Sequence, residues 1–191
     1  MNMDERLKRA VDTLGARLRD EIAKELSTLT LAPVKDDTAA TRLVDALRAI
    51  DDAKSLSDIL ETLATAAGNE AARAGVFLLS GGAVRRFRLF GFPARFEDGP
   101  VDLDLSRSGV IADAIRQGSL ATSSTGSFDE LPPDVNAIAV PLVLAAAPIG
   151  ALYAEGADAA TMEILARFAS RALESLTALK TARAVADGHA V

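Results

Sequence analysis

Two adjacent glycines, Gly81 and Gly82, separate two short runs of residues with strand character. The first run, 75–80, is apolar on both faces, whereas the second, 83–90, alternates in part. Glycine takes positive φ without a steric penalty, so a Gly-Gly pair between two such runs predicts a tight antiparallel hairpin. An antiparallel sheet is therefore the framework into which the rest of the chain must fit.

The second strand of this hairpin carries several basic residues. Its alternation predicts Phe87 and Leu89 on one side and Arg86 and Arg88 on the other. Together with Arg85 these arginines have two interpretations, a solvated strand face or an anion-binding site.

A second hairpin is predicted from two apolar runs, 137–144 and 149–154, with a turn around Ala146 to Pro148. Pro141 cannot donate to a strand ladder, so it should mark a bulge or face an unpaired edge. A short strand is expected near 120–124. Because hairpins require antiparallel strands, the fold class is α+β, with helices packed on one face of the sheet.

Apolar residues at helical spacing predict helices over 39–50, 56–67 and 106–117, and a long helix that begins at Asp158 or Thr161. Residues 91–105 form a long connection with two phenylalanines, either a functional loop or one whose rings fasten it to the core.

The N-terminal segment, 1–32, reads as an amphipathic helix, suited to a coiled coil or to dimerisation. Its apolar stripe consists of Leu7, Val11, Leu14, Leu18, Ile22, Leu26 and Leu29. Such a stripe must pack against its own domain or against a second copy. A linker at 33–38, a main domain at 39–182 and a flexible tail at 183–191 complete the expected organisation.

The composition of the chain limits the classes of partner that it is expected to bind. The 191 residues carry a formal net charge of −6, include no cysteine and no tryptophan, and contain a single histidine, His189, in the expected tail. This balance disfavours nucleic acid and anionic membranes as partners, and no apolar run approaches the length of a membrane span. The absence of cysteine excludes disulfides and thiolate chemistry and suits the cytoplasm. Adjacent acidic residues such as Asp129-Glu130 usually cap helices or lie on the solvated surface. The less favoured interpretation is that they bind a hard cation.

Five segments together resemble the GAF domain family over residues 39–180: LSDILETL at 56–63, AGVFLLSGG at 74–82, SGVIADAIRQG at 108–118, AVPL at 139–142 and IGALYA at 149–154. The resemblance implies a central antiparallel sheet with strand order 2-1-5-4-3 and terminal helices on one face. It also implies a ligand pocket on the other face, beneath the short helix and the long loops. By position, that pocket would involve Phe90, Phe92, Phe96, Ile111, Thr122, Ser123 and Asn136.

Several activities of the family do not match these residues. Cysteine-linked bilin binding and reduction of free methionine sulfoxide both use cysteine, which is absent. The cyclic-nucleotide signature is missing, because Phe128-Asp129-Glu130 has the wrong spacing. We therefore expect no cofactor, no metal and no enzymatic activity.

Two functions remain. In the first, the chain is a sensory or regulatory module that binds an unidentified small molecule and signals through its terminal helices in a homodimer. In the alternative, it is a ligand-free dimerisation domain, or one that docks a signalling protein.

Overall fold

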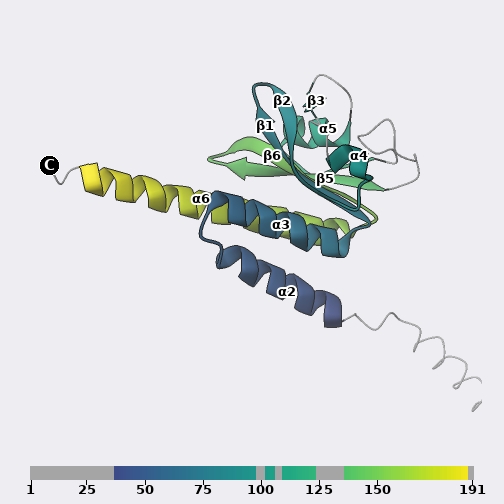
Figure 1. Ribbon diagram of the computed structural model, residues 1–191, viewed down its shortest axis with the longest axis horizontal. Helices are drawn as coiled ribbons and strands as arrows, with labels where there is room; N and C mark the ends of the chain where they lie inside the picture. Colours follow the sequence, from purple (N-terminus) through teal and green to yellow (C-terminus); the bar gives the residue numbers. More distant parts are fainter. Residues whose placement is uncertain (1–36, 98–101, 106–108, 124–135, 189–191) are drawn as a thin grey trace, which may run out of the picture. The chain divides into compact units, whose positions relative to one another are not determined.

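The computed structural model of the chain describes residues 37–97, 102–105, 109–123 and 136–188, and its centre is an antiparallel sheet (Figure 1). Six strands run in the order β3-β2-β1-β6-β5-β4. They are β1 Arg73–Ser80, β2 Ala83–Phe90, β3 Asp102–Asp104, β4 Ala121–Ser123, β5 Ala137–Leu144 and β6 Ala147–Glu155. Without β3 this is the expected order 2-1-5-4-3, so the predicted fold class is confirmed. The sequence did not predict β3, because a three-residue strand has no periodicity of its own.

The turn between β1 and β2 uses both glycines at positive φ, 62° for Gly81 and 82° for Gly82. This is the conformation that a two-residue hairpin turn requires. Further along, Val76 pairs with Arg88 but Phe77 pairs with Arg86. Phe87 is therefore the extra residue of a β-bulge, which the sequence did not predict.

The bulge corrects the expected alternation of β2. Cross-strand partners share a face of the sheet, so Arg86 lies on the face of Phe77 and Arg88 on the opposite face. Phe87 and Leu89 pack against different cores instead of together. A bulge re-aims side chains in this way because one added residue reverses the alternation. The arginines of β2 therefore do not form one basic face.

The second hairpin turns earlier than expected, at Ala145 and Ala146, both with positive φ (49° and 63°). β6 begins at Ala147 and includes Pro148 as its second residue, where a missing N–H is tolerated. The pairing shifts between Leu142 and Val143, which lets Pro148 lie opposite Val143.

Helices cover both faces of this sheet (Figure 1). They are α2 Asp37–Asp51, α3 Leu56–Glu70, α4 Ala94–Glu97, α5 Val110–Gln117 and α6 Ala159–Gly188. The longer helices α3 and α6 lie on one face, here called the α3/α6 face, and residues of α2 such as Leu43 and Leu47 pack against the same core. The short helix α5 contacts β4, β5 and β6 on the other side, here called the α5 face.

Each face has its own core, and the strands divide their residues between the two by alternation. Val76, Val140 and Leu152 belong to the core of the α3/α6 face. Phe77 and Tyr153 belong to the core of the α5 face. All five side chains are buried.

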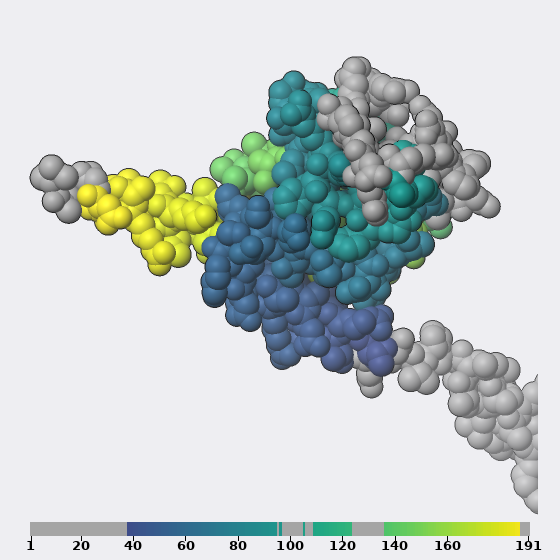
Figure 2. Space-filling view, viewed as in Figure 1, coloured from purple at the N-terminus to yellow at the C-terminus, as the bar shows by residue number. Residues whose placement is uncertain are grey.

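The chain divides into two compact units, Met1–Thr41 and Arg42–Val191. The predicted helix at 1–32 and residues 33–36 of the predicted linker lie outside the described residues, whereas residues 37 and 38 begin α2. At the other end α6 continues to Gly188, past residue 182, because residues 181–187 contain no helix breaker. Its last turns project from the rest of the second unit (Figure 2). No helix in the described residues is long and apolar enough to cross a membrane.

Candidate functional site

A buried polar cluster lies at one end of the sheet, formed by Arg73, Tyr153 and Glu155. The Glu155 side chain is completely buried, and the Tyr153 hydroxyl donates a hydrogen bond to its Oε1 atom. The Nε atom of Arg73 lies 2.6 Å from Oε2 of Glu155. An unpaired buried carboxyl group is strongly unfavourable, so the guanidinium of Arg73 compensates for the burial of Glu155.

Strand register brings these residues together. Tyr153 and Glu155 are two apart in β6 and therefore share the α5 face. Glu155 pairs with Arg73 on β1 and with Ala137 on β5, and Ala137 pairs in turn with Ser123 on β4. One row thus crosses four strands, with an ion pair on one side and a hydroxyl on the other. The small Ala137 side chain lies between them.

Glu155 keeps an acceptor that is not fully used. The Arg73 Nε atom is close to Oε2, yet no donor in the described part of the chain reaches Oε2 with hydrogen-bond geometry. The two facts agree, because an ion pair depends on distance whereas a hydrogen bond also depends on angle. Oε2 of Glu155 is therefore a buried acceptor that receives no hydrogen bond from the described residues.

Aromatic rings form the apolar side of this cluster. Tyr153 packs edge-on against Phe77, with ring centroids 6.3 Å apart, and lies 6.2 Å from Phe92. Phe92 is in edge contact with Phe96 of α4, again at 6.2 Å. Arg86, placed on this face by the bulge, donates to the backbone carbonyl of Phe96. The arginine and the ring contacts together hold α4 against the sheet.

Four of the seven residues expected in the pocket lie on the α5 face. Phe92 and Ile111 are buried there, and Phe96 packs against the same core. Ser123 shares the face because it pairs with Ala137. Their role in ligand binding remains a prediction.

The other three are placed differently. Phe90 packs against the core of the α3/α6 face, close to Gly68 of α3. Thr122 pairs with Ile138, whose side chain belongs to that core, so it faces away from Ser123. The sequence grouped these two neighbours, but adjacent strand residues point to opposite faces. Asn136 is exposed immediately before β5.

Sequence reasoning missed Arg73, Tyr153 and Glu155. One pattern would have found the last two. In residues 149–155 the strand ends Tyr-Ala-Glu, so a carboxylate follows in phase with an aromatic residue on a buried face. A charge in phase with a buried face requires a partner, and Arg73 at the start of β1 supplies it through the register alone.

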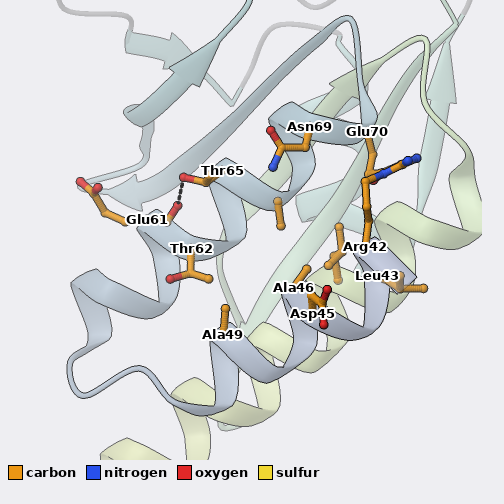
Figure 3. Close-up of a pocket in the computed structure, with 12 residues that line it drawn as sticks. Arg42, Leu43, Asp45, Ala46, Ala49, Glu61, Thr62, Thr65, Asn69 and Glu70 are labelled. Atoms are coloured by element: carbon orange, nitrogen blue, oxygen red, sulfur yellow. Dashed lines mark hydrogen bonds and ion pairs between the residues drawn. The ribbon is translucent and has the colours of Figure 1, made fainter. Parts of the chain in front are cut away.

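A hollow lies between α2 and α3, with a volume of about 490 Å³ (Figure 3). Its floor is small and apolar, including Ala46, Ala66 and Leu165. At one end Arg42 and Glu70 form a two-point ion pair, with Nε to Oε1 at 2.6 Å and Nη2 to Oε2 at 3.1 Å. This pair joins α2 to the end of α3. The hollow is therefore part of the packing interface between these two helices.

No group of three or more potential metal ligands occurs among the described residues. The arrangement on the α5 face instead offers hydrogen bonding and ionic contact beside aromatic rings.

Comparisons with known proteins identify the fold. No family model matches the chain, and no curated protein matches it. Among solved structures, the GAF domain of an Acinetobacter phosphoenolpyruvate-protein phosphotransferase has a TM-score of 0.58 at 13% identity, covering 75% of this chain and 96% of that one. Part of a methyl-accepting chemotaxis protein has a TM-score of 0.59 at 16% identity, covering 71% and 98%. The chain therefore has a GAF-like fold.

One comparison corrects an expectation from the sequence. A free methionine-R-sulfoxide reductase from Neisseria meningitidis, in complex with its substrate, has a TM-score of 0.57 at 17% identity, covering 72% of this chain and 89% of that one. This fold therefore includes an enzyme, and the expectation of no enzymatic activity is wrong. That expectation rested on the missing cysteine and on the place of the single histidine in the expected tail.

Proposed function

We propose that this chain is a sensory or regulatory module that binds a small molecule on the α5 face and responds through its terminal helices as a homodimer in the cytoplasm. The observation that carries the proposal is the completely buried Glu155, held by Tyr153 and Arg73 on that face. A folded sheet gains nothing in packing from a carboxylate at this position. Such buried charges with specific partners are concentrated at functional sites.

The aromatic rings support the same assignment. Ligand sites combine an apolar wall with a few placed polar groups. Here Phe92 and Phe96 supply the wall, and the Glu155 carboxylate and Ser123 hydroxyl are the polar groups. The proposed ligand is thus a small, partly apolar molecule with at least one N–H or O–H donor.

Native mass spectrometry of gently purified protein, compared with the denatured mass, tests this proposal. We expect a dimer that carries an added small mass, and we expect the Glu155→Gln variant to lose that mass. Glu163→Gln is the matched control, since Glu163 pairs with Arg167 on the surface of α6. If the Glu155→Gln variant kept the added mass, the ligand would have to bind at another site. A bare monomer would contradict the homodimer.

The alternative is a ligand-free dimerisation or protein-docking domain. It is favoured by apolar side chains left in solvent on the helices, namely Val44 of α2 and Ile164, Leu179 and Val185 of α6, which are 44–55% exposed. A clean dimer with no added mass would support this alternative. Removal of residues 1–32 and a Leu179→Glu variant would then identify which helix holds the dimer together.

A further inference from the structure

The outer edge of β5 is bonded to α6 through side chains. β4 pairs with β5 only at residues 137–139, so beyond this point the edge has no neighbouring strand in the described residues. The backbone N–H of Val143 donates to Oγ of Ser170, and that of Ala145 donates to Oε1 of Glu174, both at 3.1 Å. Pro141, on the same edge, has no N–H to satisfy.

The two bonds come from a single turn of α6. Ser170 and Glu174 are four residues apart, which is about 6 Å along a helix. Val143 lies in β5, and Ala145 is the first residue of the turn that follows the strand, with φ of 49°. One turn of α6 therefore bonds both the end of β5 and the turn after it, and a displacement of the strand end changes both bonds together.

Each acceptor is oriented by a further contact. The Ser170 hydroxyl donates to the Ala166 carbonyl at 2.8 Å, which leaves its lone pairs for Val143. Ser170 is one of two buried polar or charged residues among those described. Glu174 is in contact with Arg171, with Nη1 3.1 Å from Oε2. The turn that Glu174 holds contains Ala145 and Ala146, both at positive φ, which alanine adopts at a penalty. A turn in this conformation depends on outside support.

The same strand lines the candidate site. Ala137 and Ala139 of β5 lie on the α5 face, directly opposite Glu155 and Tyr153. β5 is thus in contact with the buried cluster on one face and bonded to α6 at its end. Residues 178–187 of α6 are exposed, and the last turns of the helix project from the domain (Figure 2).

The geometry points to Ser170 and Glu174 as the latch through which movement of β5 at the candidate site reaches the projecting end of α6. This inference rests on the proposed function, because it names how a change at that site is passed on. The latch is a positioning device: neither residue is expected to touch a ligand.

Site-resolved amide hydrogen exchange on the full chain tests the latch without any ligand. Ala139→Val adds two methyl groups against Tyr153 and serves as the perturbation, and Tyr153→Phe is a milder second variant in case the first does not fold. We expect either change to accelerate exchange at Val143 and Ala145 and, several-fold, at residues 175–187. In a Ser170→Ala/Glu174→Gln background, we expect the response of residues 175–187 to disappear.

Glu163→Gln/Arg167→Ala is the matched background, since these side chains lie on α6 but pair with each other. The response of residues 175–187 should persist there. Persistence in the latch background, or no response in the unmodified chain, overturns the inference. A negative hydrogen-exchange result would not affect the test for a ligand at Glu155. Failure to find a ligand would likewise not affect the hydrogen-exchange result, so the two proposals can fail independently.

Discussion

The Tyr153 hydroxyl donates to the carboxylate of Glu155, two residues further along the same face of β6. Both side chains are completely buried, so this hydrogen bond lies inside the fold, with the guanidinium of Arg73 on the other side of the carboxylate. Arg73, Tyr153 and Glu155, which come from two strands, are thus joined through the Glu155 carboxylate inside the fold.

Replacing Glu155 with alanine should therefore destabilise the protein strongly. The change removes the carboxylate that pairs with Arg73, whose side chain is only 17% exposed, and removes the hydrogen bond that the Tyr153 hydroxyl donates to Glu155. We expect a loss of about 3 kcal/mol in the free energy of unfolding, measured by urea denaturation. Glu163→Ala removes an exposed ion pair on α6 and should cost less than about 1 kcal/mol. Equal losses for the two variants would mean that burial of the cluster is not maintained in solution.

The turn between β5 and β6 offers a stabilising substitution. Ala146 has φ of 63°, a conformation that glycine adopts freely. Ala146→Gly should raise the free energy of unfolding by up to about 1 kcal/mol, because the relief of strain exceeds the added freedom of the unfolded chain. Ala147→Gly, one residue into β6, should instead destabilise by about 0.5–1 kcal/mol. Thermal denaturation of the two variants shows whether each substitution raises or lowers stability. A loss of stability in both variants would argue against a left-handed turn at Ala146.

The start of α6 predicts a pH effect. Hydrogen bonds from the backbone N–H of Thr161 and then from its hydroxyl, both at 2.8 Å, hold the pKa of Asp158 below its ordinary value. A carboxyl with a depressed folded-state pKa stabilises fully above its unfolded pKa, and this contribution is lost as pH falls through the folded-state value. Asp158→Ala should cost about 1 kcal/mol at pH 7, and less below about pH 4. Urea unfolding at pH 7 and pH 3.5 measures this difference, which a pH-independent cost would contradict.

Two glycines should differ sharply in their tolerance of alanine. A Cβ atom on Gly150 would lie 2.1 Å from the backbone oxygen of Phe77, so β1 and β6 would have to separate. A Cβ on Gly68 of α3 would lie 2.8 Å from Cγ and 3.0 Å from Cβ of Phe90, so this contact is with a side chain and not with backbone. We expect Gly150→Ala to cost at least about 2 kcal/mol, and Gly68→Ala to cost less because the preference of alanine for the helix offsets part of the overlap. Chemical denaturation measures the free energy of unfolding of both variants. If Gly150→Ala had little effect, β1 and β6 would have to lie further apart than in this structure.

Much of the fold was predictable because local patterns coincide with it. The turn at Gly81-Gly82, the apolar runs of β1, β5 and β6 and the helical stripe of α6 each identify one element. The resemblance to the GAF family then supplied the order of strands, which periodicity does not contain. The glycine of the IGALYA segment also has a physical reason here, the close approach of Gly150 to Phe77.

The candidate site was predictable only in part, because it depends on register. Ser123 and Phe92 share a face with Glu155, but Thr122 and Phe90 do not, and a one-residue difference decides each case. Neither the bulge at Phe87 nor the pairing of Arg73 with Glu155 has a local signature. Both follow from which residues of distant segments lie opposite each other, which a single sequence does not state.

The bulge at Phe87 makes β2 tolerant of a change in length at this one position. An in-frame loss of this codon would leave Arg86 opposite Phe77 and Arg88 opposite Val76, so regular pairing would return with both guanidinium groups on their present faces. Only the contact of the Phe87 ring with the core of the α3/α6 face would be lost. In a population of related genes, this position should thus tolerate deletion better than its neighbours in the strand, where the loss of one residue reverses the alternation of side chains.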